Sequence, residues 1–209
     1  MEGHEHRPRR IIRFSALERS VHWLVALSFA YVAVTGLSMW SPRMFWISAL
    51  VGGGTTSRAW HPWAGVLFTA AFGVMFVRWA SQMKIDGDDR QWLLRAHRYV
   101  VHDHSRLPES GRFNAGQKLL FWIQFLALVL LLASGIVLWL PESTSRVLRE
   151  GAILIHPATA VVSMTGIIVH IYMGTAAVPH ALRAMVQGWV TPAWTAFHHP
   201  KWYREIRKD

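Results

Sequence analysis

Two histidines lie within one strongly apolar stretch of the chain, LIHPATAVVSMTGIIVHIYMG at residues 154–174. An imidazole can ligate a metal, relay a proton or hydrogen-bond a neighbouring helix. His156 and His170 are 14 residues apart, and in an α-helix that spacing is about 21 Å of rise and nearly four whole turns. The two rings therefore project from one helical face at two depths, and each requires a partner at its own depth.

The elements that must position these histidines are membrane-spanning helices. The chain has 209 residues, of which 52% are hydrophobic, and it combines a mean hydropathy of +0.22 with a net charge of +10. Four apolar stretches reach the roughly 20 residues that a bilayer-spanning helix needs. The sequence predicts an all-α integral membrane four-helix bundle in a single domain, residues 1–209, with spans at about 16–40, 59–79, 118–140 and 153–177.

Prolines mark the expected ends of these spans. Pro62 and Pro157 are predicted to lie in the opening turns of the second and fourth spans, where a missing N–H is tolerated. Pro42 and Pro141 are predicted to follow the first and third spans. The charged N-terminal segment is long for a signal peptide, and no clear small-residue cleavage site follows it, so the first apolar stretch is interpreted as a retained membrane helix.

Basic residues are concentrated in alternate connections of the predicted bundle. Most of them lie in the N-terminal arm, in a loop of about residues 81–113 and in a tail of about residues 178–209. The positive-inside rule therefore predicts that both termini and this loop are cytoplasmic. Because the charge lies in connections between spans, nucleic-acid binding is excluded. The loop segment QWLLRAHRYVV predicts a short amphipathic helix, and we recognise no internal repeat in the chain.

This orientation assigns a depth to each of four histidines. The first span enters from the cytoplasm, so His22 is expected near the inner side. The second span enters from outside, so His61 is expected near the outer side. Depth matching gives two pairs, His22 with His170 and His61 with His156, and no other pairing is consistent with depth.

The composition narrows the chemistry of these pairs. The chain has no cysteine, which excludes cysteine-ligated iron–sulfur clusters and thioether haem attachment. A metal with two axial imidazoles in an apolar bundle predicts b-type haem, one for each pair and hence two. Small residues are expected to make room for it: Gly36 at the depth of the outer pair, and Gly166 and Gly174 four residues on either side of His170.

Histidines within a membrane can also have other roles. Each intramembrane histidine could be a hydrogen-bonded contact between helices. Four histidines that match in depth as two pairs weaken that interpretation. A proton relay would include carboxylates, and no Asp or Glu occurs between residues 19 and 85 or between residues 110 and 141, so the first three spans have no internal carboxylate. His97, His102 and His104 could bind a metal, although a solvated loop explains them more simply. His180, His198 and His199 are expected to be structural or docking residues, and His4 and His6 to lie in a flexible end.

Beyond these single residues, the chain resembles the γ subunit of membrane-bound formate dehydrogenase, a di-haem cytochrome b that anchors the complex and delivers electrons to quinone. The resemblance runs from about Arg13 to Ile206 and is carried by RFSALERSVHW, AWHPWAG, FNAGQKLLFW, LIHPATA, IVHIYMG and HHPKWYREI. FNAGQK and HHPKWYREI are specific to this subfamily. The histidine spacing alone is shared with hydrogenase cytochromes b and related anchors.

The resemblance implies haem ligation by His22, His61, His156 and His170, in agreement with the depth argument. It also implies a quinone pocket near Asn114, Gly116 and Gln117 beside His170, with menaquinone or ubiquinone as the electron acceptor. Amide groups and backbone N–H groups at a helix start can donate hydrogen bonds to quinone oxygens. The alternative, which stays open at this point, is that Asn114 simply caps the third span.

The same resemblance implies partner subunits whose chemical groups are absent from this chain. These are an iron–sulfur β subunit and a molybdenum or tungsten catalytic α subunit, in a higher oligomer of the heterotrimer in the bacterial inner membrane. Electrons would pass from the iron–sulfur partner through the haems to quinone, with cytoplasmic proton uptake. The chain has no thiolate, no phosphate cradle and no polar cleft with which to oxidise formate.

Two other functions remain open from the sequence. An equivalent di-haem anchor of a hydrogenase or of a sulfur-compound reductase would share the haems and the orientation but differ in its partner. A histidine-relay transporter would keep the spans and lack b-type spectral bands.

Overall fold

A computed structural model gives the fold for residues 10–100, 103 and 107–208. The chain divides into two compact units. The bundle unit comprises residues 20–79 and 122–169, and the described residues of the loop unit are 10–19, 80–100, 103, 107–121 and 170–208. The predictions for His4, His6, His102 and His104 lie outside the described residues.

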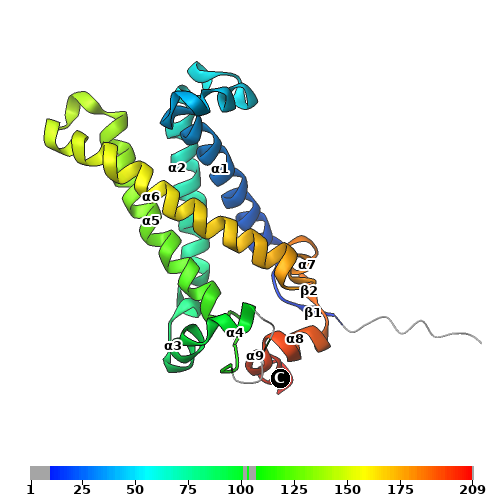
Figure 1. The fold of residues 1–209 in the computed structure, drawn as a ribbon. Helices are drawn as coiled ribbons and strands as arrows, with labels where there is room; N and C mark the ends of the chain where they lie inside the picture. Colours follow the sequence, from blue (N-terminus) through cyan, green and yellow to red (C-terminus); the bar gives the residue numbers. More distant parts are fainter. Residues whose placement is uncertain (1–9, 101–102, 104–106, 209) are drawn as a thin grey trace, which may run out of the picture. The chain divides into compact units, whose positions relative to one another are not determined.

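Helices make up most of the described chain (Figure 1). The long helices are α1 (Ala16–Trp40), α2 (Gly54–Trp79), α5 (Ala115–Trp139) and α6 (Arg146–Tyr172). The short helices are η1 (Pro42–Val51), η2 (Ala80–Met83), α3 (Gly87–Leu94), α4 (Ala96–Val100), η3 (Pro141–Ser143), η4 (Met173–Ala177), α7 (Ala181–Val186), α8 (Pro192–His198) and α9 (Pro200–Glu205). The strands are β1 (Ile11–Ile12) and β2 (Trp189–Val190).

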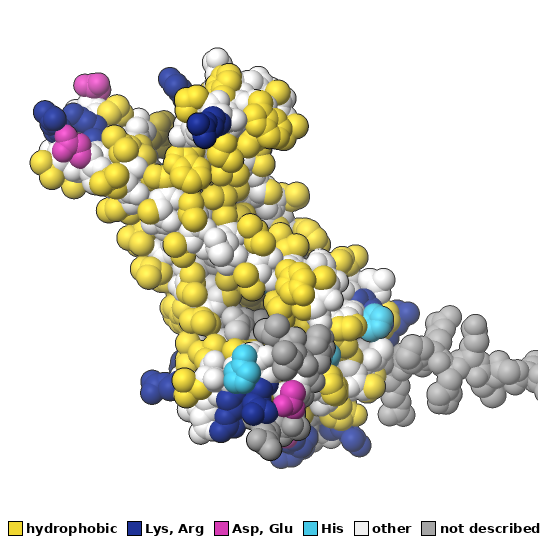
Figure 2. Space-filling model, viewed as in Figure 1, with side chains coloured by type: hydrophobic (Ala, Val, Ile, Leu, Met, Phe, Trp, Pro, Cys, Tyr) yellow, Lys and Arg dark blue, Asp and Glu magenta, His cyan; other side chains and the backbone are white. Residues whose placement is uncertain are grey.

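Four helices are long and apolar enough to cross a membrane, which confirms that part of the prediction. They run over Ala16–Trp40, Gly54–Met83, Ala115–Trp139 and Arg146–Ala177, with mean hydropathies of 1.6, 1.5, 2.4 and 1.9. Side chains that point away from the bundle are apolar, such as Leu27, Leu126 and Ile168, each at least 60% exposed. On the face drawn in Figure 2, hydrophobic side chains cover these long helices, as expected for surfaces solvated by lipid.

The prediction that Pro62 and Pro157 lie in opening helical turns is wrong. The helix α2 begins at Gly54 and α6 at Arg146, so both prolines lie inside their helices. Hydropathy marks only the apolar part of a helix, whereas the backbone hydrogen bonding of these two helices begins earlier, in more polar turns. A proline within a helix removes one backbone hydrogen bond, and in each case it directly follows a histidine, His61 or His156.

Aromatic and polar contacts join the helices of the bundle unit. The rings of Phe29 on α1 and Phe68 on α2 lie 5.6 Å apart, and Phe76 on α2 stacks on Phe125 of α5 at 4.4 Å. Gln124 on α5 donates from Nε2 to the carbonyl oxygen of Ser163 on α6 at 3.0 Å, and Ser163 Oγ donates back to Gln124 Oε1 at 2.6 Å. Reciprocal bonds of this kind satisfy buried polar groups between membrane helices.

The loop unit is held together by pairs of residues that are distant in sequence. Strands β1 and β2 pair antiparallel, with Ile11 opposite Val190. Lys118 Nζ lies 2.6 Å from Asp89 Oδ2, and these two side chains are only 12% and 10% exposed. The amphipathic segment predicted as one helix at QWLLRAHRYVV is divided between α3 and α4, with Arg95 between them among the described residues.

Candidate functional site

Two imidazoles of the bundle unit lie close together. His61 on α2 and His156 on α6 are both half-buried. Their ring centroids lie 6.2 Å apart, with an angle of 67° between the ring planes. The structure thus brings together the two histidines that the depth argument assigns to the outer pair.

Each of these rings is bonded to a hydroxyl group of the preceding long helix. Thr35 Oγ1 on α1 lies 2.8 Å from His61 Nδ1. Ser134 Oγ on α5 lies 2.9 Å from His156 Nδ1. Neither hydroxyl was singled out from the sequence.

A glycine follows each hydroxyl residue and lies against the same imidazole. A Cβ atom at Gly36 would lie 3.3 Å from Cε1 of His61, and one at Gly135 would lie 3.4 Å from Cε1 of His156. Gly36 was expected at the depth of the outer pair, and it does lie beside His61. Gly135 was missed.

A repeated pattern in the sequence could have revealed all of these residues. Thr35 and Gly36 begin TGLSMWSP, and Ser134 and Gly135 begin SGIVLWLP. Hydroxyl residue, glycine, tryptophan and proline have the same spacing in both segments, and the next long helix then carries a His-Pro pair. The helix pairs α1–α2 and α5–α6 therefore repeat one local arrangement, contrary to the prediction of no internal repeat.

The predicted inner pair is divided between the two units. His22 is half-buried on α1 in the bundle unit, with its ring 5.6 Å from and perpendicular to that of Trp23. His170 lies in the last turn of α6 and belongs to the loop unit. Their pairing stays a prediction.

The glycines predicted beside His170 differ in backbone structure. Gly166 lies within α6, but Gly174 lies in η4, a π-helix that follows α6. The α-helical spacing that placed Gly174 on the face of His170 does not continue beyond Tyr172. A Cβ atom at Gly174 would meet no atom within 4 Å, so no close approach requires a glycine there.

Three of the residues predicted for quinone binding, Asn114, Gly116 and Gln117, lie at the start of α5. Asn114 Oδ1 accepts from Gln117 N at 2.9 Å, and Gln117 Oε1 accepts from Asn114 N at 3.0 Å. This reciprocal arrangement is a capping box, so Asn114 does cap the helix. A Cβ atom at Gly116 would lie 3.4 Å from Asn114 Oδ1 and 3.5 Å from the Trp92 ring, and Tyr99 also hydrogen-bonds the Asn114 side chain.

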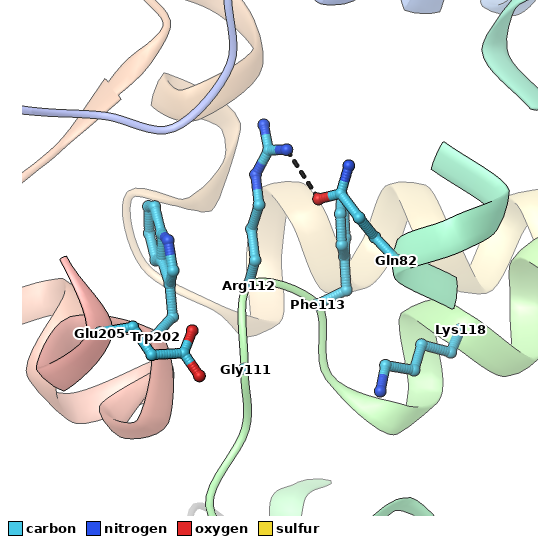
Figure 3. A pocket seen from close by; sticks show the side chains of 7 residues that line it. All are labelled: Gln82, Gly111, Arg112, Phe113, Lys118, Trp202 and Glu205. Carbon is cyan, nitrogen blue, oxygen red and sulfur yellow. Dashed lines mark hydrogen bonds between the residues drawn. The ribbon is translucent and has the colours of Figure 1, made fainter. Parts of the chain in front are cut away.

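A pocket of about 350 Å³ lies in the loop unit near this cap (Figure 3). Its lining residues are Gln82, Gly111, Arg112, Phe113, Lys118, Trp202 and Glu205. Its two cations already have partners: Arg112 lies 2.9 Å from Glu18 and 2.8 Å from Gln82, and Lys118 is paired with Asp89. None of the residues predicted for quinone binding is among those that line this pocket.

Two polar side chains of the loop unit, Arg13 and Tyr99, have shifted pKa values. Arg13 is 4% exposed, and burial, followed by the charge of Arg112, lowers the pKa of its guanidinium to about 9. The group is therefore still protonated at neutral pH. Burial raises the pKa of Tyr99, and the neighbouring Arg13 opposes that rise.

Four further histidines are described by the structure, and none of them belongs to the predicted pairs. His199 is buried, with Nδ1 2.7 Å from the carbonyl oxygen of Gly111, and burial holds the pKa of this imidazole well below its usual value. His198 packs against the rings of Trp194 and Phe197. His180 has a left-handed backbone with φ of 64°, and His97 is exposed on α4. Among residues 10–100, 103 and 107–208, no cluster of three or more His, Asp or Glu side chains could hold a metal ion.

Known proteins resemble this chain over nearly its full length. The model of the prokaryotic cytochrome b561 family matches residues 13–188. The chain is 39% identical over 201 residues to the cytochrome b556(fdo) subunit of formate dehydrogenase from Escherichia coli (strain K12), which covers 95% of this chain and 94% of that protein.

Two further relatives are similar. The cytochrome b556(Fdn) subunit of the nitrate-inducible formate dehydrogenase of Escherichia coli (strain K12) is 32% identical over 204 residues, 96% of this chain and 93% of that protein. The formate dehydrogenase cytochrome b556 subunit of Haemophilus influenzae (strain ATCC 51907 / DSM 11121 / KW20 / Rd) is 35% identical over 199 residues, 94% of this chain and 83% of that protein. The chain therefore belongs to the prokaryotic cytochrome b561 family, within the group of formate dehydrogenase cytochrome b556 subunits.

Proposed function

We propose that this chain anchors a formate dehydrogenase complex in the bacterial inner membrane and carries electrons from an iron–sulfur partner through two b-type haems to quinone. The four membrane-spanning helices and the cytochrome b family support this proposal. A haem held by two imidazoles supplies one-electron transfer when it is bound. The residues of this chain bind it, orient it and exclude water from it.

His61 and His156 are proposed as the axial ligands of an outer haem. Two imidazoles that share one metal, with metal–nitrogen bonds of about 2 Å, have ring centres about 6 Å apart. The observed separation of 6.2 Å fits this requirement. In both rings the hydrogen bond to the hydroxyl is at Nδ1, which leaves Nε2 as the ligating atom.

The donor set fits haem b rather than a covalently attached haem. The chain contains no cysteine, so its histidines and apolar contacts must hold the group without a thioether bond. Gly36 and Gly135 leave open the space next to Cε1 of the two rings.

His22 and His170 are proposed as the ligands of an inner haem. The sequence supports this pairing, because His170 follows His156 by nearly four helical turns and His22 is predicted at the matching depth of the first span. Gly166, four residues before His170 on α6, is proposed to pack against this haem.

The quinone, menaquinone or ubiquinone, is proposed to bind beside the inner haem near Asn114, Gly116, Gln117 and His170. The capping box engages the Asn114 carbonyl oxygen, and Tyr99 also hydrogen-bonds this side chain, so the remaining amide hydrogen is the donor that we assign to a quinone oxygen. The protons for quinone reduction are proposed to come from the cytoplasm.

The partners are proposed to be an iron–sulfur β subunit and a molybdenum or tungsten α subunit, in a higher oligomer of the heterotrimer. The relatives are named as the cytochrome subunits of formate dehydrogenases, which supports partners of this kind. Both termini are proposed to be cytoplasmic, since the basic residues gather in the N-terminal arm, the loop of about residues 81–113 and the tail.

The observation that carries the proposal is the facing pair His61 and His156, and double variants test it. The purified complex is expected to contain two haems b per chain in a pyridine haemochrome assay. His61→Ala and His156→Ala should each lose one haem, and the variant with both changes should still retain one. The variant His22→Ala with His61→Ala should retain none.

The exposed His97 provides the matched control, because His97→Ala should retain both haems. A wild-type complex without b-type bands would overturn the proposal. Loss of both haems in the His61→Ala, His156→Ala double variant, with the complex still assembled, would overturn the pairing.

A further inference from the structure

The hydroxyls of Thr35 and Ser134 have equivalent surroundings on two different helices. Thr35 is completely buried and Ser134 is 6% exposed, so water does not compete for their hydrogen bonds. Thr35 Oγ1 lies 2.8 Å from the carbonyl oxygen of Tyr31, and Ser134 Oγ lies 2.6 Å from that of Leu130. In both cases the acceptor is the carbonyl one turn earlier in the same helix.

These contacts fix the direction of the hydrogen bonds to the imidazoles. A hydroxyl has one proton, and a backbone carbonyl oxygen can only accept. Each hydroxyl therefore donates to its own helix and accepts the proton of the nearby Nδ1. The carbonyl oxygens of Val32 and Leu131, each three residues before the hydroxyl, lie 3.2 Å and 3.4 Å from it and can also only accept.

The consequence is a defined tautomer for both rings. A neutral imidazole with its proton on Nδ1 carries a lone pair on Nε2. That is the form in which it ligates a metal, and the partner of the other nitrogen sets both the ring orientation and the basicity of the ligand. A Cβ atom at Gly36 or Gly135 would lie against Cε1 of the same ring, between the two nitrogens, so one turn of each helix supplies both the acceptor and the space.

We propose that Thr35 and Ser134 are positioning residues for the outer haem, which hold His61 and His156 in the Nδ1–H tautomer with Nε2 directed at the iron and thereby lower its reduction potential. The inference rests on the proposed function, in which these two histidines share one haem. A hydrogen-bond acceptor at Nδ1 makes the imidazole a stronger donor, and a stronger donor favours the ferric state.

Redox titration of the b-type bands in the purified complex tests the inference. Thr35→Val and Ser134→Ala should each shift the midpoint potential of one haem to more positive values, with the other haem unchanged, and the double variant should shift it further. The conservative variants Thr35→Ser and Ser134→Thr retain the hydroxyl and should restore the potential of the wild type.

Ser28 on α1 supplies the matched control. It is 6% exposed, and its hydroxyl donates to the carbonyl oxygen of Leu24 at 2.7 Å, as Thr35 donates to that of Tyr31. Its other contact, at 3.1 Å, is the carbonyl oxygen of Val25 on the same helix. Ser28→Ala should leave both potentials unchanged.

If a variant binds its haem weakly, the haem content of the purified complex is the second measurement. Loss of one haem in Thr35→Val with retention in Thr35→Ser supports the role. Unchanged potentials at full haem content in Thr35→Val and Ser134→Ala would overturn it, as would an equal shift in Ser28→Ala. These outcomes require two b-type haems in the wild type, whereas their absence from the wild type would instead overturn the proposed function.

Discussion

At the residue scale, the absence of a side chain at position 36 matters as much as the imidazole beside it. A Cβ atom there would lie 3.3 Å from Cε1 of His61, so Gly36→Leu must push the ring aside. Overpacking of this kind costs about 1–3 kcal/mol, which corresponds to a roughly 5- to 150-fold weaker affinity for the outer haem. We expect the outer haem to be depleted while the spectrum of the inner haem survives.

The control for this variant is another helical glycine of the bundle unit. A Cβ atom at Gly65 on α2 would meet nothing within 4 Å, so Gly65→Ala should retain both haems, whereas Gly36→Ala should already lose part of the outer one. Equal loss of both haems in Gly36→Leu would contradict the assignment of Gly36 to the outer site.

The sequence predicted the facing of His61 and His156 but not the hydroxyls that hold them. The histidines could be paired because the order of the spans and the distribution of basic residues predict the depth of each one in the membrane. The hydroxyls could not, because Ser and Thr in apolar helices commonly bond to the previous turn of their own helix. Ser28 and Thr69 make that bond as Thr35 does, and besides the tertiary contact only the repeat shared by TGLSMWSP and SGIVLWLP distinguishes Thr35 from them.

At the scale of elements, hydropathy predicted four membrane helices but not where two of them begin. The apolar run fixes the part of a helix that lipid requires, so α1 at Ala16–Trp40 agrees with the predicted 16–40. The starts of α2 and α6 lie in more polar sequence, GTTSRAW and RVLREGA. No apolar signal marks these turns, and the prolines inside the helices suggested later starts.

The start of α5 shows how one residue can have a structural and a proposed chemical role. Asn114 caps the helix through Oδ1, and Asp and Ser are equally good N-cap residues, whereas Leu costs about 1 kcal/mol. If the Asn114 amide also donates to quinone, Asn114→Asp and Asn114→Ser should slow quinone reduction without loss of thermal stability. Asn114→Leu should slow it and also destabilise the helix start.

Turnover with a soluble quinone analogue and the reduced-minus-oxidised spectrum are the measurements for these variants. Both haem bands should be retained in all of them, because Asn114 is no haem ligand in the proposal. Normal turnover in Asn114→Asp and Asn114→Ser, with slow turnover only in Asn114→Leu, would show that the residue acts as a cap alone.

At the scale of the whole molecule, the proposed function depends on which side of the membrane each connection faces. Protons taken from the cytoplasm for quinone reduction, with electrons that arrive from outside, move charge across the bilayer. Each elementary charge that crosses 100 mV corresponds to about 2.3 kcal/mol. The orientation thus determines whether electron transfer through this chain is linked to the membrane potential.

The absence of cysteine from the chain allows a direct test of this orientation. Ser143 in η3 and Ser81 in η2 are both exposed, and a single cysteine at either position would be the chain's only thiol. If the termini are cytoplasmic, Ser143→Cys faces outward and should react with a membrane-impermeant maleimide in intact spheroplasts. Ser81→Cys should react only after permeabilisation, since it begins the proposed cytoplasmic loop. The reverse labelling pattern, in complexes that retain both haem bands, would invert the orientation and with it the proposed cytoplasmic source of protons.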